Sequence, residues 1–398
     1  MASAEQHAAI DAWTRGFNVM LRAPPGTGKS WTIMEACKQR CAQDADAKLL
    51  VLAYNTELAA ELVSLLQDTD LVDRVDCYTF HGLCSHCIQL AVDDNALEEC
   101  LAGAASGTLD VKRLDVDGVL LDEGQDINRL HLSLLRLVVD LKDAHFFVVG
   151  DPMQRLYDFG RYPALEHHLD SPEATFDGAR TWHAHELTES RRITPQMAAV
   201  VDAYFGTGLR STKDATRCEA VHVHTCKRWK MGERIEAILA ASGMEPHATL
   251  VAATTKNGNA PLRCAINHLS SKGVPIYLQG VDGSDAHVRR GKMRIMSYHA
   301  CKGTEADLVV CIVTPDAAWN PLYVALTRAR VALHLLFIDG DAHHMMTTLQ
   351  SLCATSGVVD VDGASLRQKP KPPPPSREER DRLFSERSKP TLRFMDAP

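Results

Sequence analysis

The strongest chemical signal in the chain is a glycine-rich segment at residues 23–30, with the sequence APPGTGKS. It follows a short apolar run at 17–21 and precedes a segment, 31–40, that has no proline or glycine. This order of strand, glycine-rich turn and helix is that of a P-loop, which binds nucleotide phosphates. Gly26 and Gly28 lack a Cβ, so backbone N–H groups can turn toward a phosphate, and the helix dipole adds to the attraction.

Two side chains at the end of this segment complete the predicted nucleotide site. Lys29 is expected to reach the β- and γ-phosphates, and the Ser30 hydroxyl is expected to bind Mg²⁺. The other residues expected to line the phosphates are Pro25, Gly26, Thr27 and Gly28. The alternative is a chance glycine-rich turn that opens a helix, but the Lys-Ser pair at the required place favours the P-loop.

An acidic pair follows the next chemically informative strand. Residues 116–121 are predicted to form a buried strand, and the sequence DEGQD follows at 122–126. The carboxyl ends of parallel strands are where α/β sheets bind ligands. Asp122 is expected to hold Mg²⁺ through water, and Glu123 to polarise the attacking water. Alone, the pair would also fit a solvated strand end; after a P-loop it favours a nucleoside triphosphatase.

A third segment links this chemistry to a possible second ligand. The predicted strand 145–149 runs into the sequence GDPMQ at 150–154, where Gln154 is a candidate sensor of the γ-phosphate. Tyr157 and Phe159 follow and alternate with polar residues. Two interpretations stay open: an edge packed in the core, or a platform on which nucleobases stack.

The second half of the chain repeats the α/β pattern without a P-loop. Arg191 and Arg192 stand just before a predicted helix start at 194–195. Further strands are predicted at 249–254, 274–278, 292–297, 307–313 and 331–338, with helices at 262–269 and 320–330. This alternation indicates a second parallel sheet, and therefore a nucleotide site in a cleft between two domains.

Composition and length set the class of protein. The chain has 398 residues, 45% hydrophobic and 24% charged, as expected for a soluble globular protein of two or three domains. A net charge of −8 argues against a generally basic nucleic-acid coat but allows a locally basic groove. Twelve cysteines beside a nucleotide motif indicate a reducing compartment. With no signal pattern and no membrane-length apolar run, we expect a cytoplasmic or nuclear, intracellular protein that is not secreted and has no membrane contact.

Two other segments have residue types that could serve a function. His81, Cys84, His86 and Cys87 lie close together in sequence, but one helix cannot easily aim all four at a zinc ion, so buried thiols are the default. The sequence KPKPPPP at 369–375 and the charged stretch after it predict a disordered tail at 366–398. This tail is expected to act as a spacer, with a short motif for an accessory protein as the alternative.

Taken in order, these motifs resemble the UvrD/Rep-type superfamily 1 DNA helicases, with the F-box DNA helicases as near relatives in motif wording. The resemblance runs from Gln6 to 338 and includes every motif of that family. The matching segments are Gln6, 23–30, Tyr54 with Asn55, 79–81, 122–126, 150–154 with Tyr157 and Phe159, 187–192, 297–305 and 323–328.

The resemblance implies an α/β fold of two RecA-like P-loop NTPase-type domains that grip ATP and Mg²⁺ in the cleft between them. It implies a monomeric motor that moves 3′ to 5′ along single-stranded DNA in replication, repair or recombination. Arg192 and Arg328 would be arginine fingers supplied across the cleft. Gln6 would read the adenine edge, and Gly303 and Glu305 would contribute to nucleotide binding, with Glu305 at the ribose. The residues expected to contact the DNA strand are Tyr54, Asn55, His81, Tyr157, Phe159 and His299.

The chain departs from this family in two respects. The accessory domains are reduced, the first to about 83–117 and the second to a loop at about 280–292, so domains are predicted at 1–185 and 186–365. The sequence therefore predicts translocation more strongly than it predicts duplex unwinding. In the family an arginine after the P-loop and a tyrosine before the fourth-motif arginine sandwich the adenine; here Trp31 and Arg191 stand at these positions, so a swapped sandwich is expected. The alternative is that Trp31 packs in the core and Arg191 is a solvated residue at a helix start. An RNA-directed motor stays open, as does a scaffold without turnover, although the intact catalytic set speaks against the scaffold.

Overall fold

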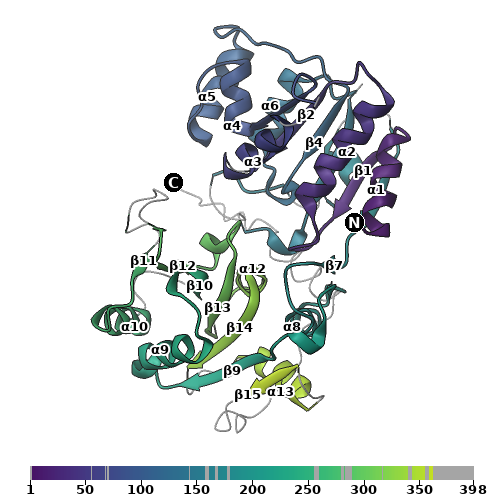
Figure 1. The fold of residues 1–398 in the computed structure, drawn as a ribbon. Coiled ribbons are helices and arrows are strands. Elements are labelled where there is room, and N and C mark those ends of the chain that lie inside the picture. Colours follow the sequence, from purple (N-terminus) through teal and green to yellow (C-terminus); the bar gives the residue numbers. More distant parts are fainter. Residues whose placement is uncertain are drawn as a thin grey trace, which may run out of the picture. The chain divides into compact units, whose positions relative to one another are not determined.

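The computed structural model divides into two α/β units, and each is described by itself (Figure 1). Unit 1 comprises residues 1–193 and 319–324, and unit 2 comprises 194–318 and 325–398. The structure describes residues 2–54, 56–67, 69, 71–142, 144–156, 161–165, 169–176, 180–254, 260–278, 282, 289–315, 317–338, 343–354 and 358–361. Within these ranges, no helix combines the length and apolar character needed to cross a bilayer.

Unit 1 is built on a six-stranded sheet in the order β3-β2-β4-β5-β1-β6, and every pairing among these strands is parallel. Its strands are β1 (Asn18–Arg22), β2 (Leu49–Ala53), β3 (Val75–Thr79), β4 (Gly118–Leu121), β5 (His145–Gly150) and β6 (Trp182–Glu186), followed by the short β7 (Glu189–Ser190). Its helices are α1 (Ala4–Thr14), α2 (Lys29–Gln43), α3 (Thr56–Gln67), α4 (Phe80–Cys87), α5 (Asp94–Ala105), α6 (Arg129–Val138) and α7 (Pro172–Thr175).

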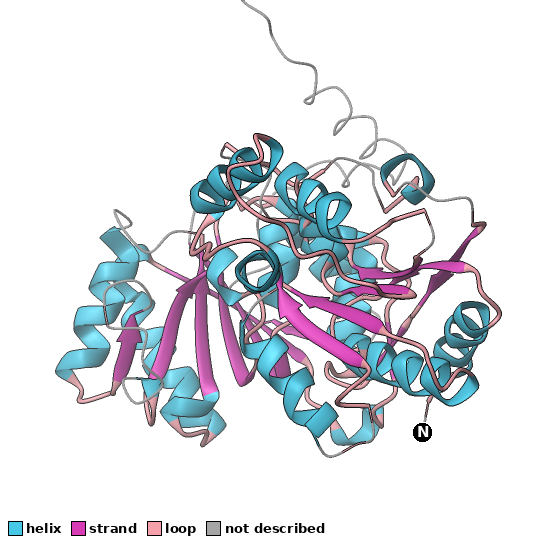
Figure 2. Ribbon diagram, turned by 90° about the horizontal axis from the view of Figure 1, so that it is seen from above, coloured by secondary structure: helices cyan, strands magenta, loops and turns pink. Residues whose placement is uncertain are grey.

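Both faces of this sheet are covered, which explains why its central strands are apolar throughout. Helices α1, α2 and α3 pack on the face that carries Phe147 and Val149. Helices α4, α5 and α6 pack on the opposite face, which carries Phe146 and Val148. Successive side chains of a strand point to opposite faces, so a strand buried on both sides needs apolar residues at each position. Figure 2 shows helices flanking the strands.

Unit 2 is built on a seven-stranded sheet in the order β11-β12-β10-β13-β14-β9-β15, again with parallel pairings among the described strands. Its strands are β8 (Arg210–Ser211, outside this sheet), β9 (Val221–Cys226), β10 (Thr249–Ala253), β11 (Ile276–Leu278), β12 (Met293–Ser297), β13 (Ala306–Val313), β14 (Ala329–Ile338) and β15 (Val359–Val361). Its helices are α8 (Pro195–Phe205), α9 (Met231–Ser242), α10 (Ala260–Ser271) and α13 (Met345–Cys353), and α12 (Trp319–Leu326) spans the division between the units. Two α/β units on parallel sheets confirm the predicted fold class.

The boundary between the units differs from the predicted 185/186. Strand β6 pairs with β1 along its whole length, and the chain after it stays on the same unit. The backbone N–H of Leu187 donates to the Arg22 oxygen (2.8 Å), and that of Arg191 donates to the Gly26 oxygen (2.9 Å). These backbone contacts keep unit 1 continuous to Ile193.

Other predicted segments also shift or fall outside the described residues. The helix predicted at 320–330 ends at Leu326, because Ala329 already pairs with Ala306 of β13. The reduced insertion at about 83–117 contains most of α4, all of α5 and the chain that leads to β4. Most of the loop at 280–292 and the whole tail at 366–398 lie outside the described residues.

Trp13 is the largest side chain in the core on the α1 side of unit 1. It is fully buried, and its ring meets Phe147 edge-on with centroids 5.7 Å apart. Gly118 of β4 leaves the space for it, since an added Cβ would lie 2.7 Å from the indole. Close packing of this kind leaves little room for relaxation when the ring is removed.

We therefore expect Trp13→Ala to lower the free energy of unfolding by about 3–5 kcal/mol, through lost burial and the cavity left behind. Denaturant unfolding followed by circular dichroism measures this. Trp229→Ala is the matched control, because its side chain is 69% exposed and its loss should change stability by less than about 0.5 kcal/mol. Equal effects of the two substitutions would contradict the assignment of Trp13 to the core.

Candidate functional site

The P-loop between β1 and α2 has the backbone geometry that phosphate binding requires. Gly26 and Gly28 have positive φ angles of 75° and 91°, a region that favours glycine. Helix α2 begins at Lys29 with Gly28 as its N-cap, and no side chain caps the first turn. The first-turn N–H groups of α2 can therefore serve an anion, as the sequence predicts.

Lys29 and Glu123 face each other across this loop. The Lys29 ammonium donates to the Ala23 carbonyl oxygen (3.3 Å) and lies 3.8 Å from a carboxylate oxygen of Glu123. Asp122, which is buried, accepts a hydrogen bond from the Glu123 N–H (2.7 Å). The carboxylate predicted as the base thus lies beside the predicted phosphate-binding lysine, and the predicted metal carboxylate is bonded to the backbone of the same residue, Glu123.

Glu123 reaches this position through an unusual backbone conformation. Its φ angle is +50°, and among the described residues it is the one non-glycine with positive φ. Such a conformation costs roughly 1–3 kcal/mol and is concentrated at functional sites. This conformation turns the chain at the end of β4, so that the Glu123 side chain points to Lys29. The buried Asp122 carboxylate is bonded to the Glu123 backbone. No sequence signal indicated this feature.

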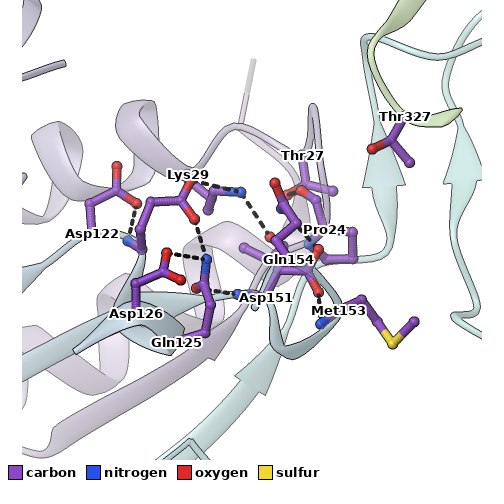
Figure 3. Close-up of polar contacts among 12 residues, drawn as sticks. Pro24, Thr27, Lys29, Asp122, Gln125, Asp126, Asp151, Met153, Gln154 and Thr327 are labelled. Atoms are coloured by element: carbon purple, nitrogen blue, oxygen red, sulfur yellow. Dashed lines mark hydrogen bonds and ion pairs between the residues drawn. The ribbon is translucent and has the colours of Figure 1, made fainter. Parts of the chain in front are cut away.

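Gln125 joins the acidic segment to the segment after β5, although the sequence did not single it out as a site residue. Its side-chain oxygen accepts from the N–H of Asp151 (2.9 Å). Its amide nitrogen donates to the Glu123 carboxylate and to Asp126 (3.3 Å). Figure 3 shows Gln125 between Asp126 and Asp151. Gln125 is buried, so these contacts orient all three partners.

Asp151 is the second residue that sequence reasoning missed. Its carboxylate accepts hydrogen bonds from the Gln154 amide (2.9 Å), the Met153 N–H (3.0 Å) and the Tyr323 hydroxyl (3.1 Å). Burial raises the pKa of Asp151, and the nearby Lys29 charge and these hydrogen bonds oppose that rise. The predicted sensor Gln154 is therefore held by the same carboxylate that contacts helix α12.

Gln6 lies behind the P-loop and supports it. Its amide nitrogen donates to the Thr27 carbonyl oxygen (3.2 Å) and to the Thr32 hydroxyl (3.0 Å), and its oxygen accepts from the Ser3 N–H (2.9 Å). The side chain is buried, and a Cβ on Gly28 would lie 2.8 Å from its nitrogen. The structure thus shows a bracing role for Gln6; its reading of adenine stays a prediction.

The segment with the paired arginines lies against the P-loop of the same unit. The Ser190 hydroxyl donates to the Pro25 oxygen (3.0 Å) and accepts from the Arg192 N–H (3.2 Å). An added Cβ on Gly26 would lie 2.4 Å from the Arg192 Cβ. The expectation that Arg191 and Arg192 come from the second domain is therefore corrected, since both belong to unit 1. Arg191 and Trp31 are both exposed, with 41% exposure for Trp31.

Four of the predicted nucleotide and strand residues lie in unit 2, namely Arg328, Gly303, Glu305 and His299. Arg328 is buried and donates to the Thr327 hydroxyl (3.1 Å). Gly303 has a φ of +77°, and the Glu305 carbonyl oxygen accepts from the Arg294 guanidinium (2.5 Å). His299 begins a short 3₁₀ turn after β12, and burial lowers its pKa.

A cavity of about 410 Å³ in unit 1 brings together two of the predicted strand-contacting residues, Tyr54 and His81. The other residues that line it are Phe80, Asp94, Asp126, Asn128, His131, Arg161, Tyr162 and Ala164. Arg161 lies 5.2 Å from the centre of the Tyr162 ring, and both side chains contact Glu98 of α5. Asn55, Tyr157 and Phe159 lie outside the described residues.

The cavity is lined by aromatic rings, by the basic side chains His81 and Arg161, and by the carboxylates Asp94 and Asp126. Aromatic rings offer stacking surfaces, while His81 and Arg161 offer donors. Tyr162 was not predicted as a site residue. It follows the predicted pair Tyr157 and Phe159 by a few residues, and nothing in its sequence spacing indicated that it would line the cavity. Asp126 lines the cavity and is also bonded to Gln125, so one short segment reaches both the P-loop side and the cavity.

The side chains of the His/Cys group at 81–87 contact different partners. His81 lies 3.2 Å from Asp94, whereas His86 stacks on Tyr78 and is bonded to Lys112 (2.7 Å). Cys84 and Cys87 are buried, and burial raises the pKa of the Cys84 thiol to about 12. The divergent contacts agree with the default of buried thiols.

A comparison with family models finds a match to part of unit 1. Residues 6–160 match the model of a family described as an AAA domain. That match includes the P-loop, the acidic segment and residues 150–154. No curated protein matches the chain.

Among solved structures, the chain is similar to the arterivirus helicase nonstructural protein 10, with 11% identity and a TM-score of 0.45. The alignment covers 84% of this chain and 62% of that chain, so the chain spans less than two thirds of the length of that helicase.

His131 makes the cavity sensitive to acid. Its ring stacks on Phe80 with centroids 4.1 Å apart, and burial, with a smaller effect of His81, lowers its pKa to about 3. The folded protein therefore keeps His131 neutral, while the unfolded chain takes up a proton below about pH 6.5. The contribution of His131 to the free energy of unfolding is fully present above pH 6.5 and is lost as the pH falls toward 3.

We expect the free energy of unfolding to fall by up to about 1.4 kcal/mol per pH unit from this residue alone between pH 6 and 4. His131→Gln keeps an acceptor at this capping position but cannot take up the proton, so its unfolding free energy should depend less steeply on pH. Urea titrations of both proteins at several pH values give the two slopes. Equal slopes would show that His131 does not stay neutral when folded.

Proposed function

We propose that this chain is an ATP-dependent, superfamily 1-type motor that moves 3′ to 5′ on single-stranded DNA. One observation carries the proposal: residues 122–126 connect the P-loop side of unit 1 with the aromatic cavity. Glu123 faces Lys29, Asp126 lines the cavity, and the buried Gln125 amide bonds to both carboxylates. A change at the phosphate side can therefore alter the cavity through a few hydrogen bonds.

The P-loop residues fit ATP and Mg²⁺. Gly26 and Gly28 both have positive φ angles, so the loop can adopt the conformation of a phosphate-binding turn, and the first turn of α2 has no capping side chain. Lys29 and the backbone N–H groups would hold the phosphates, while Ser30 and Asp122 would hold Mg²⁺, which neutralises charge on the phosphates when bound. Pro25 and Thr27 would shape the same loop.

Glu123 is proposed as the base that accepts a proton from the attacking water, and Gln154 as the residue that senses the γ-phosphate. Arg192, beside the P-loop, and Arg328 would stabilise the charge that develops during hydrolysis. Trp31 and Arg191 would hold the adenine ring, with Gln6, Gly303 and Glu305 supporting the nucleoside. His299 would contact the strand, as would Tyr54, His81 and Tyr162.

The first test is turnover. Glu123→Gln should leave ATP binding intact and lower the hydrolysis rate by at least about a hundredfold, because a positioned base contributes on that scale. Rates are measured with and without single-stranded DNA, double-stranded DNA and single-stranded RNA. Glu99→Gln, an exposed glutamate of α5, is the control and should hydrolyse ATP like the parent protein. Near-normal turnover of Glu123→Gln would show that Glu123 is not the catalytic base. Stronger stimulation of hydrolysis by RNA than by DNA would show that the protein moves on RNA.

The second test concerns the cavity. Tyr54→Ala and Tyr162→Ala should each weaken binding of a single-stranded oligonucleotide by roughly 1–3 kcal/mol, the usual contribution of one stacked base. Fluorescence anisotropy measures the affinity, and Tyr→Phe at each position is the control that keeps the ring. If affinity is unchanged while thermal stability falls, these rings serve packing rather than strand binding.

A further inference from the structure

Four consecutive exposed residues follow strand β9 in unit 2: Lys227, Arg228, Trp229 and Lys230, here called the KRWK patch. They form the short turn between β9 and α9 (Figure 1). Trp229 has 69% of its surface exposed. A single exposed hydrophobic side chain is ordinary on a protein surface, and Leu90 and Val92 are exposed to a similar degree. What distinguishes Trp229 is that the other three residues of the patch are cations.

The indole is surrounded by positive charge. The Lys227 ammonium lies 5.5 Å from the centre of the Trp229 ring, within the range of a cation–π interaction. Arg228 is a second cation beside the ring in sequence, and Lys230, a third, forms an ion pair with Glu233 (3.3 Å). This run of cations stands against a net charge of −8 for the whole chain.

The backbone under the patch is held firmly. The Lys230 N–H donates to the Lys227 oxygen (2.8 Å), and the next residue, Met231, is buried. Gly232 lies against α10, because an added Cβ would come within 2.6 Å of the His268 Cβ. The backbone that carries Trp229 is therefore anchored on both sides of the turn, and its side chain lies at the surface.

The chemistry of the patch selects its ligand. A flat aromatic face stacks on any nucleobase, and nearby cations pair with the phosphates on either side. The patch follows the carboxyl end of a parallel strand, the edge at which such sheets bind ligands. An acidic peptide would use the cations but has no group that needs an exposed indole face.

We propose that the KRWK patch is a binding site for single-stranded nucleic acid, in which a base stacks on Trp229 and adjacent phosphates pair with Lys227 and Arg228. The proposal rests on the proposed function for its class of ligand, but none of its residues belongs to the P-loop site or to the cavity of unit 1. It would give unit 2 a second contact with the strand, in addition to the one proposed for His299.

The test uses the full chain and a labelled oligothymidylate, with affinity measured by fluorescence anisotropy. Trp229→Ala should weaken binding roughly 5- to 100-fold, while Trp229→Phe should recover part of the affinity because it keeps a stacking face. The double variant Lys227→Gln, Arg228→Gln should reduce the slope of log affinity against log salt by about 0.7 for each phosphate that it no longer neutralises. Lys272→Gln, an exposed lysine of the same unit that pairs with Glu236, is the matched control and should bind like the parent protein.

The outcomes separate this proposal from the proposed function. If Tyr54→Ala weakens binding but Trp229→Ala and the double variant do not, the proposal that the KRWK patch binds the strand is overturned, and the proposed function stands. If the parent protein binds no oligonucleotide, both fail. Quenching of tryptophan fluorescence by polyglutamate but not by the oligonucleotide, present in the parent protein and lost in Trp229→Phe, would instead assign the patch to an acidic partner and overturn the proposal.

Discussion

The candidate site of unit 1 depends on one buried amide. Gln125 accepts a hydrogen bond from the Asp151 backbone and donates to the carboxylates of Glu123 and Asp126. Because the amide is buried, any movement of it would leave several polar groups unpaired away from water, which costs more than breaking one exposed hydrogen bond. It holds Glu123 toward Lys29 and Asp126 at the cavity. One short segment therefore places one carboxylate beside the P-loop lysine and the other at the cavity.

Helix α1 adds a second constraint on the nucleotide site. Gln6 bonds to the P-loop, and its neighbour Glu5 accepts from both the N–H (2.8 Å) and the hydroxyl (2.5 Å) of Thr188. Two adjacent side chains thus tie the P-loop and the chain before Arg192 to one helix. Gly26 allows the close approach, since any Cβ there would collide with Ser190 and Arg192. The position of Arg192 is therefore set by packing around the P-loop.

Unit 1 buries polar side chains, whereas unit 2 exposes an apolar ring. Asp151 and Gln154 are buried and satisfy one another, which gives them fixed directions. Trp229 is apolar yet exposed, so its ring is open to a ligand. Burial of polar groups and exposure of apolar ones both carry a cost in stability, and both are informative about function for that reason.

The sequence by itself determined what is local. Strand, glycine turn and helix lie within one continuous stretch, so the P-loop was predictable from 23–30 and its flanks. Strands buried on both faces are apolar at every position, so the parallel sheets were predictable as well. Only the tertiary structure decided which distant residues meet: Arg192 beside Gly26, Tyr323 on Asp151, and Tyr162 in the cavity with Tyr54. Such contacts join residues far apart in the chain, and local residue patterns alone do not specify which side chains pack together across that separation.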